Sequence, residues 1–253
     1  MERKHIPESE NRLTILYALR RLGPATAMQL LQFLVENDLM NYFTMQLSLS
    51  DMQEQGQLAA DPHPLGDLLT LTPGGEYAIE SFAHRIPVSR RQLMDAQAPR
   101  WKERFRAEQL TPADSFTLED GRVCLRLRLL EGTSSLLDIL FTLPKDTPPT
   151  FLEKRWRGAA QAVYSAVSLN LSQAFDPTAP TPALPQTAAV ERSGDQEWLL
   201  SLVDDAEHPT LTLLLPLADE ALARHCAARW PSQCAQLRQR ILQELRDGLP
   251  ETP

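Results

Sequence analysis

The strongest constraint on the fold is a helical pattern that occurs twice in the C-terminal part of the chain. The segment KRWRGAAQAVYSAVSLNL (154–171) aligns with ARWPSQCAQLRQRILQEL (228–245) at a shift of 74 residues. The alignment places Trp156 over Trp230 and apolar residues over apolar residues at successive helical turns. Two long helices with matching apolar positions predict that one supersecondary unit occurs twice in this region.

Three short alternating segments precede each of these helices. The first set is SFTLE, a turn at Asp120–Gly121, VCLRLRLLE and SLLDILFTLP, and the second set is TAAVE, EWLLSLVDD and PTLTLLLPL. Alternation and the Asp-Gly turn are typical of antiparallel strands. The strand ends FTLP and LLLP align at a slightly shorter shift than the helices do.

The order β-β-β-α, used twice, predicts one antiparallel sheet of about six strands with two long helices on one face. A proline-rich linker at 176–187 joins the two units. The other face of the sheet alternates in polarity, so it is either solvated or covered by a partner.

The N-terminal part is predicted to contain four helices and a hairpin. Thr26 is expected to cap a second helix whose apolar residues lie on or near one face; these are Met28, Leu31, Phe33, Leu34 and Val35. A third helix is predicted from Thr44 to Gln55, ending at Gly56. The strands QLAAD and LLTLT follow, and Pro73 opens a fourth helix. This order predicts a winged helix-turn-helix domain.

The predicted fold class is therefore α+β, with an N-terminal winged helix-turn-helix and a C-terminal antiparallel sheet carrying two long helices. The expected domains are the winged helix at 1–87, a basic helical connector at 88–110 and the α+β domain at 111–253.

Three stretches carry a family resemblance: ENRLTILYAL (10–19), ENDLMNYFTMQLSLSDMQEQGQL (36–58) and SFAHRIP (81–87). They resemble a bacterial family of winged-helix regulators, domain of unknown function 4364. The resemblance is best over residues 1–90 and continues loosely to about 175. It implies the winged-helix fold and a regulatory role, but no mechanism, because the family has no established activity.

The predicted third helix is the candidate interaction site. Met45, Leu49 and Met52 recur at helical spacing and are expected to face the core. The residues expected to contact DNA or a partner are Tyr42, Phe43, Thr44, Gln46, Leu47, Ser50, Asp51 and Glu54. Gln and Ser side chains can form hydrogen bonds with base edges in the major groove.

The charge of this region argues against strong DNA binding. Residues 22–84 contain eight acidic residues and no Lys or Arg, which gives a formal charge of −8, equal to that of the whole chain. Phosphate contacts supply much of the affinity of DNA-binding proteins, and they come mostly from Lys and Arg. The candidates for phosphate contact all lie outside this acidic region: Arg3, Lys4, Arg20, Arg21, Arg85, Arg90, Arg91, Arg100 and Arg104. The alternative is that the basic connector pairs with acidic neighbours.

Two functions remain open. The first is a transcriptional regulator that binds double-stranded DNA and uses its C-terminal part for dimerisation or effector binding. The second is a non-enzymatic protein-interaction adaptor. The sequence contains no phosphate loop, nucleophile elbow or HExxH motif, so we expect no enzyme activity and no cofactor. His225, Cys226 and Cys234 match no zinc spacing, and no metal is expected. A homodimer is the common arrangement of such regulators. No apolar run is long enough to span a bilayer and no signal sequence is evident, so a cytoplasmic location without membrane contact is expected.

Overall fold

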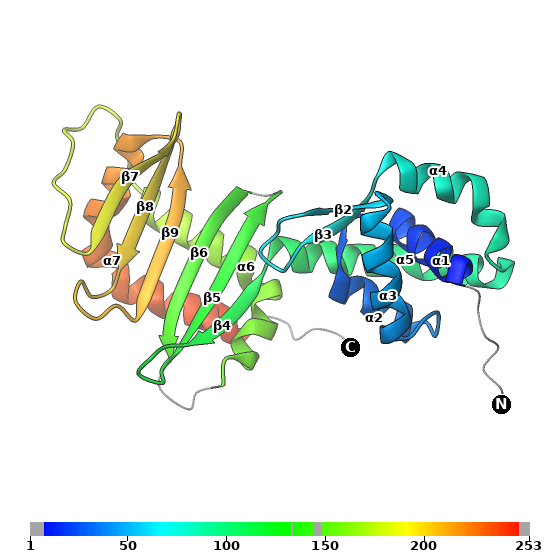
Figure 1. Ribbon diagram of the computed structural model, residues 1–253. Coiled ribbons are helices and arrows are strands. Elements are labelled where there is room, and N and C mark those ends of the chain that lie inside the picture. Colours follow the sequence, from blue (N-terminus) through cyan, green and yellow to red (C-terminus); the bar gives the residue numbers. More distant parts are fainter. Residues whose placement is uncertain (1–7, 133, 144–147, 248–253) are drawn as a thin grey trace. The chain divides into compact units, whose positions relative to one another are not determined.

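The computed structural model describes residues 8–132, 134–143 and 148–247 (Figure 1). The chain divides into two compact units. Unit 1 comprises residues 1–109 and unit 2 comprises residues 110–253. Both combine helices with an antiparallel sheet, so the protein is a mixed α+β protein. Within the described ranges, no helix combines the length and apolar character needed to cross a bilayer.

Unit 1 contains five α-helices and a small sheet among its described residues. Its elements are α1 (Glu8–Leu22), β1 (Ala25–Thr26), α2 (Ala27–Glu36), α3 (Tyr42–Glu54), β2 (Leu58–Asp61), β3 (Leu68–Leu71), α4 (Pro73–Phe82), the 3-10 turn η1 (Ala83–Arg85) and α5 (Val88–Leu110). The Thr26 side chain accepts a hydrogen bond from Gln29 N, and the Gln29 side chain accepts one from Thr26 N. This reciprocal cap confirms the predicted start of α2.

The sheet of unit 1 has the antiparallel order β1-β3-β2. The predicted hairpin is present as β2 and β3, and β3 also pairs with the two residues of β1. β1 was not expected from the sequence because two residues carry no detectable alternation. It ties the start of α2 to the hairpin.

The residues expected to form a connector fold as α5, and one face of α5 is buried in the core of unit 1. Met94, Ala98, Trp101 and Phe105 lie at helical spacing on this face. Trp101 packs edge-on against Phe33 of α2, with ring centroids 5.8 Å apart. The helix therefore belongs to the hydrophobic core of unit 1 as well as carrying basic side chains.

The buried face predicted for α2 is partly wrong. Met28 and Val35 were expected on or near the buried face of α2 but are 69% and 49% exposed. The buried face instead consists of Leu30, Phe33 and Leu34, and residues two positions from one of these point away from the core. α3 starts at Tyr42, close to the start predicted at about Thr44, and Asn41 caps it by accepting a hydrogen bond from Thr44 N at 3.0 Å.

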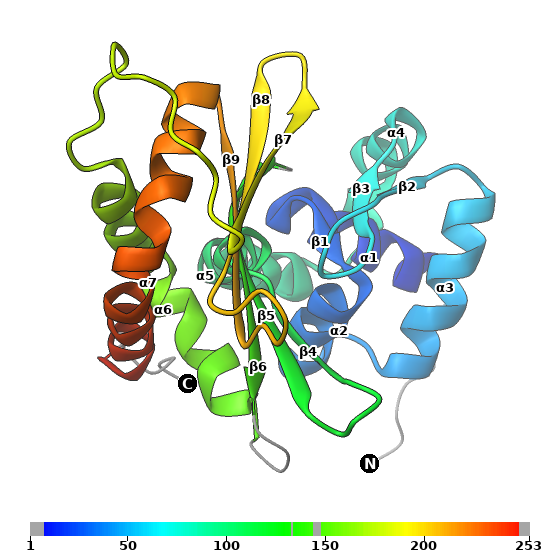
Figure 2. The ribbon, with the colours of Figure 1, turned by 90° about the vertical axis from the view of Figure 1, so that its left-hand side faces the viewer.

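Unit 2 is built on the predicted six-stranded antiparallel sheet, in the order β4-β5-β6-β9-β8-β7 (Figure 1). Its elements are β4 (Ala113–Thr117), β5 (Val123–Glu131), β6 (Ser134–Leu143), α6 (Thr150–Ser172), β7 (Ala188–Gly194), β8 (Glu197–Val203), β9 (Leu211–Leu217) and α7 (Glu220–Asp247). Figure 2 shows α6 and α7 covering the same face of this sheet, as predicted.

The two β-β-β-α halves of unit 2 are equivalent in detail. The indole N–H of Trp156 donates to the carbonyl oxygen of Arg128 in β5 at 2.8 Å, and that of Trp230 donates to the carbonyl of Val203 in β8 at 2.6 Å. Both tryptophans are fully buried, as predicted. Each half thus fixes its helix to its middle strand through the same contact.

The halves are related by an approximate two-fold axis through the centre of the sheet. In the β6–β9 ladder Ile139 pairs with Leu213. The pairs on either side of this one are those expected if a two-fold rotation places β6 on β9 and β9 on β6. The register makes Phe141 equivalent to Leu215, a shift of 74 residues. The shorter shift expected from FTLP and LLLP is wrong, because the ladder and not the proline sets the register.

Candidate interaction site on α3

The buried and exposed faces of α3 are clearly separated. Met45, Leu49 and Met52 are buried, as predicted, and Ser48 is buried with them. Ser48 lies three residues from Met45, which places it on the same side of the helix.

The exposed face begins with large apolar side chains. Phe43 is 77% exposed and Leu47 is 73% exposed, and the ring of Tyr42 packs edge-on against that of Phe43. Gln46, Ser50 and Glu54 are also exposed, while Thr44 and Asp51 are half-buried. The structure therefore brings the predicted contact residues to one helix, six of the eight of them on its solvent-exposed surface.

One of the two acidic side chains on α3 is neutralised by α1. Nη2 of Arg12 lies 2.8 Å from a carboxylate oxygen of Asp51, and Nη1 of Arg12 donates to Oε1 of Gln55 at 2.9 Å. From Tyr42 to Ser50 the helix contains no charged residue. Of the two acidic residues of α3, Glu54 is therefore the one that would repel a phosphate most strongly.

The basic residues at the end of α1 are engaged within unit 1. Nε of Arg20 lies 3.4 Å from a carboxylate oxygen of Glu76, and Nε of Arg21 lies 2.6 Å from one of Asp95. A hydrogen bond with the Tyr17 hydroxyl raises the pKa of Arg21, and Asp95 adds to this shift. Both arginines are partly exposed, so these pairs are weak and do not prevent contact with phosphate.

Several arginines near and within α5 have acidic or aromatic neighbours. Nη1 of Arg90 lies 3.4 Å from Glu10, and Nε of Arg104 lies 3.1 Å from Glu108. The exposed Arg85 lies over the ring of Phe82.

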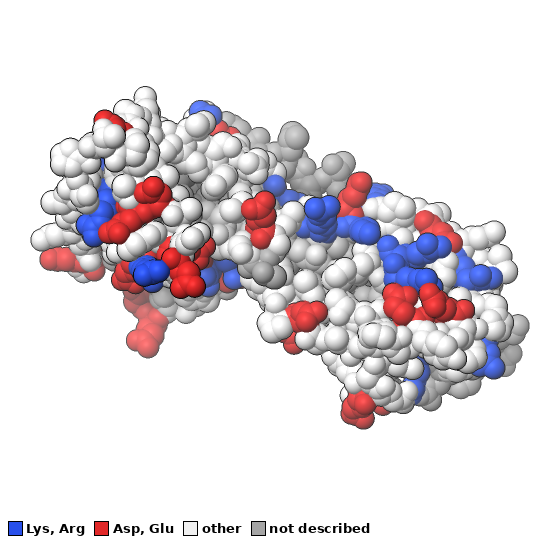
Figure 3. All heavy atoms as spheres, turned by 90° about the horizontal axis from the view of Figure 1, so that it is seen from above, with Lys and Arg blue, Asp and Glu red and all other residues white. Residues whose placement is uncertain are grey.

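The remaining phosphate-contact candidates differ in their surroundings. Arg100 is exposed and Arg91 is half-buried, whereas Arg3 and Lys4 lie outside the described residues. On the face of unit 1 seen in Figure 3, blue and red side chains adjoin one another. This distribution agrees with the alternative in which the basic residues pair with acidic neighbours.

The acidic turn of unit 2 is a structural element. Asp204 follows β8 and accepts hydrogen bonds from Thr210 and from Leu211 N, and it forms an ion pair with Arg238 of α7. Burial alone would raise the pKa of Asp204, but the hydrogen bonds and the arginine outweigh burial and lower it. Across the described part of the chain, no group of three or more His, Cys, Asp or Glu side chains is arranged to hold a metal ion.

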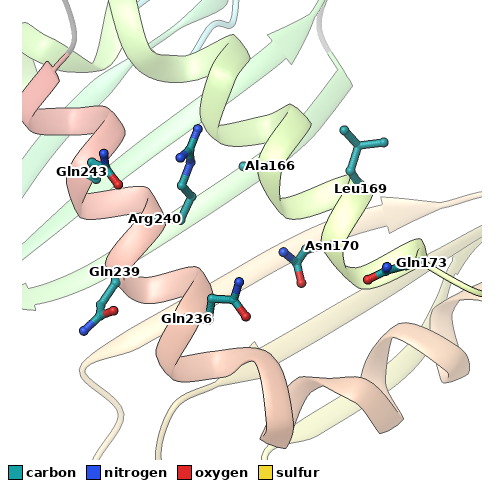
Figure 4. Close-up of a pocket in the computed structure, with 8 residues that line it drawn as sticks. All are labelled: Ala166, Leu169, Asn170, Gln173, Gln236, Gln239, Arg240 and Gln243. Carbon is teal, nitrogen blue, oxygen red and sulfur yellow. The ribbon is translucent and has the colours of Figure 1, made fainter.

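Two hollows lie beside the helices of unit 2. The larger is a groove of about 690 Å³ between α6 and α7, where Asn170 and Gln236 point toward the space between the helices (Figure 4). The smaller is a cavity of about 230 Å³ between the helices and strands β8 and β9, with Ser168, Leu215 and Cys226 in its lining. Neither was expected from the sequence, because each depends on how the two helices meet.

Comparison with known proteins decides the family. The profile of a domain of unknown function, DUF4364, matches residues 11–171. The chain belongs to this family. The DUF4364 match begins within α1 and ends one residue before the end of α6, so it covers most of unit 1 and of the first half of unit 2.

Comparisons beyond DUF4364 are weak. An IcIR transcriptional regulator from Alicyclobacillus acidocaldarius is 12% identical, with a TM-score of 0.24 and coverage of 96% of this chain and 98% of that chain. The Agobacterium tumefaciens repressor BlcR is 15% identical, with a TM-score of 0.21 and coverage of 88% and 94%. Scores this low establish neither a shared fold nor a shared function. No curated protein shows a significant match.

Proposed function

We propose that unit 1 is a winged helix-turn-helix domain and that the protein is a cytoplasmic transcriptional regulator that places α3 in the major groove of duplex DNA. The order α1-β1-α2-α3-β2-β3 and the strand order β1-β3-β2 are those of a winged helix. In this proposal β2 and β3 form the wing, and unit 2 serves dimerisation or effector binding.

One observation carries the proposal: the first part of α3, from Tyr42 to Ser50, is uncharged and has a face that the core does not use. Reading helices contact base edges mainly through their N-terminal residues. Gln46 and Ser50 are exposed there and carry suitable donors and acceptors. The positive end of the helix dipole lies at the same end, which favours a nearby phosphate.

The affinity for random-sequence DNA is expected to be low. Unit 1 combines an acidic segment at 22–84 with arginines that have acidic neighbours. Phosphate contacts would come from partly exposed arginines such as Arg20, Arg85 and Arg100. Binding should therefore weaken steeply as salt rises.

The first test is selection of duplexes from a random-sequence library at low salt, followed by titration of the enriched sequence. Gln46→Ala should reduce discrimination between the enriched and a random duplex by about 1–3 kcal/mol, as expected for loss of one good base contact. Gln239→Ala, an exposed glutamine of α7, is the matched control and should leave discrimination unchanged. Absence of any enrichment would remove direct DNA reading.

The charge on α3 gives a second test of DNA contact. Glu54→Gln should raise the affinity for any duplex, because it removes an exposed negative charge from the proposed interface. Asp51→Asn should raise it as well, because Arg12 then loses its carboxylate partner and is available to a phosphate. Glu119→Gln, an exposed acid of unit 2, is the control.

A second candidate function is favoured by the apolar side chains of α3. Phe43 and Leu47 are each more than 70% exposed and lie one helical turn apart. Apolar anchors of this kind dominate many protein interfaces. We infer that, if α3 binds a protein, Leu47→Ala reduces binding most, and the partner co-purifies equally from nuclease-treated and untreated lysate. Loss of the partner after nuclease treatment would favour the DNA-binding function instead.

A further inference from the structure

The smaller cavity of unit 2 lies between four elements of that unit. α6 contributes Tyr164 and Ser168, β8 contributes Leu200, β9 contributes Leu215, and α7 contributes Cys226. The cavity has a volume of about 230 Å³, and no charged residue lines it. Tyr164 and Ser168 are half-buried, so the cavity is partly open and a small molecule can reach it from solvent.

The internal symmetry of unit 2 supplies a reference for how the same place can be filled. Trp156 and Trp230 are equivalent, which makes Ser168 of α6 equivalent to Leu242 of α7 and Cys226 of α7 equivalent to Leu152 of α6. Leu152 and Leu242 both pack against the apolar core of unit 2. Each is larger than the residue that lines the cavity at the equivalent position.

The strands repeat this difference. Leu125 pairs with Phe141 in the first half, and Leu200 pairs with Leu215 in the second. Leu125 and Leu200 each lie three residues before the carbonyl that accepts the tryptophan hydrogen bond, so Phe141 occupies the position of Leu215. Phe141 is buried in the core. At three pairs of equivalent positions, therefore, the residue with the smaller side chain lines the cavity: Ser168 compared with Leu242, Cys226 compared with Leu152, and Leu215 compared with Phe141.

The lining restricts what the cavity can hold. Five of the nine lining residues are leucines, and the lining residues that carry a polar side-chain group are Tyr164, Ser168, Ser172 and Cys226. Burial raises the pKa of Cys226 to about 11, so the thiol is neutral at physiological pH. Burying a charged ligand without a charged partner is strongly unfavourable, so a neutral ligand is required.

The size of the cavity sets the scale of this ligand. An engineered apolar cavity of roughly 150 Å³ holds a benzene molecule. The present cavity is larger and has hydroxyl groups in its lining. It therefore fits an aromatic ring, or a short aliphatic chain, that carries one hydrogen-bonding group.

We propose that the cavity between α6, α7, β8 and β9 is a binding site for a small, neutral, mostly apolar molecule with one polar group. The site lies wholly within unit 2, and its test involves no DNA. The cavity proposal is therefore unaffected if α3 does not bind DNA, and the DNA-binding proposal is unaffected if the cavity binds no ligand.

The test is titration of the full-length protein with indole, followed by calorimetry. Wild type is expected to bind one indole per chain. Ser168→Leu, which copies Leu242, should weaken binding at least tenfold because the added carbons fill the cavity. Ser168→Ala is the matched control and should retain binding, because it leaves the space open. Absence of indole binding by wild type, or binding by folded Ser168→Leu equal to that of wild type, would overturn the proposal.

Cys226→Leu, which copies Leu152, gives an independent second variant if Ser168→Leu fails to fold. The location is checked on wild type alone by methyl NMR spectra recorded with and without indole. The largest shifts should come from the methyl groups of Leu200 and Leu215. Shifts confined to leucines outside the cavity would place the binding elsewhere and contradict the assignment.

Discussion

The two halves of unit 2 share a backbone plan and differ in what fills it. Both use three antiparallel strands, a long helix and a buried tryptophan that donates to the middle strand. Beside β8 and β9 the two helices leave a cavity, and at the equivalent place beside β5 and β6 the corresponding residues are the larger Phe141, Leu152 and Leu242. The fold therefore depends on the shared contacts. The side chains that differ lie at the cavity, where they leave space for a ligand.

The shared tryptophan contacts should give the largest effects. Trp156→Ala and Trp230→Ala should each lower the free energy of unfolding of unit 2 by about 3–5 kcal/mol, because each removes a fully buried ring and leaves a carbonyl without its donor. Urea unfolding followed by near-ultraviolet circular dichroism measures the loss. Trp198→Ala, at a half-buried position of β8, is the control with a smaller cost. A large cost in only one half would show that the halves are not energetically equivalent.

The shared plan is also the part that the sequence predicts well. The helical match at 74 residues and the alternating segments predicted the β-β-β-α order along the chain in each half, a single antiparallel sheet and the burial of both tryptophans. These features follow from periodicity that extends over many residues, and such patterns are the most reliable local signal. The hairpin and the start of α2 in unit 1 were predictable for a similar reason, since turn and capping residues act locally.

The features that the sequence did not reveal all depend on contacts between distant segments. Asp51 was identified as a contact residue, but its ion pair with Arg12 was not predicted, because the two residues are 39 positions apart in the sequence. The exposure of Met28 depends on which side of α2 faces the core. The cavity depends on small residues of α6 and α7 meeting at one place. The sequence thus predicted the elements and the surface of α3, while charge compensation and the cavity required the structure.

The two halves of unit 2 also differ in the polar contacts of Asp204. Its equivalent in the first half is Leu129, so its hydrogen bonds with Thr210 and Leu211 and its pair with Arg238 occur only in the second half. Asp204→Asn should lower the free energy of unfolding by about 2–3 kcal/mol at pH 7, because hydrogen bonds to a charged group are lost.

The pH dependence of this effect has a definite sign. The folded-state pKa of Asp204 is lowered, so its stabilising contribution is fully present above the unfolded pKa of about 4 and is lost as the pH falls through the folded value. The difference between wild type and Asp204→Asn should therefore shrink in urea titrations carried out in acid. Asp114→Asn, in an exposed pair with Arg128 of the first half, is the control and should cost at most about 1 kcal/mol. A difference that stays constant with pH would contradict the assigned role.

The comparison can be sharpened by giving the place beside β5 and β6 the helix residues that line the cavity beside β8 and β9. The double substitution Leu152→Cys and Leu242→Ser should lower the free energy of unfolding by about 1–2 kcal/mol, less than for fully buried leucines because both side chains are half-buried. It should also open a second site, so that calorimetry gives two indoles per chain. The reverse pair, Ser168→Leu with Cys226→Leu, should give none. An unchanged stoichiometry in the first variant would mean that Phe141 alone fills the space.

The smallest effect is expected where α6 ends beside the cavity. Ala174 adopts φ +57°, a left-handed conformation that a glycine adopts without steric cost. Ala174→Gly should therefore raise the free energy of unfolding by about 1 kcal/mol. Ala179→Gly, in the exposed linker with an ordinary φ, should instead leave stability unchanged or slightly lower it. Equal effects of the two substitutions in urea titrations would show that the backbone at Ala174 stores no strain. If only Ala174→Gly raises the free energy of unfolding, the chain keeps a strained turn beside the cavity. Backbone strain of this kind is concentrated at functional sites.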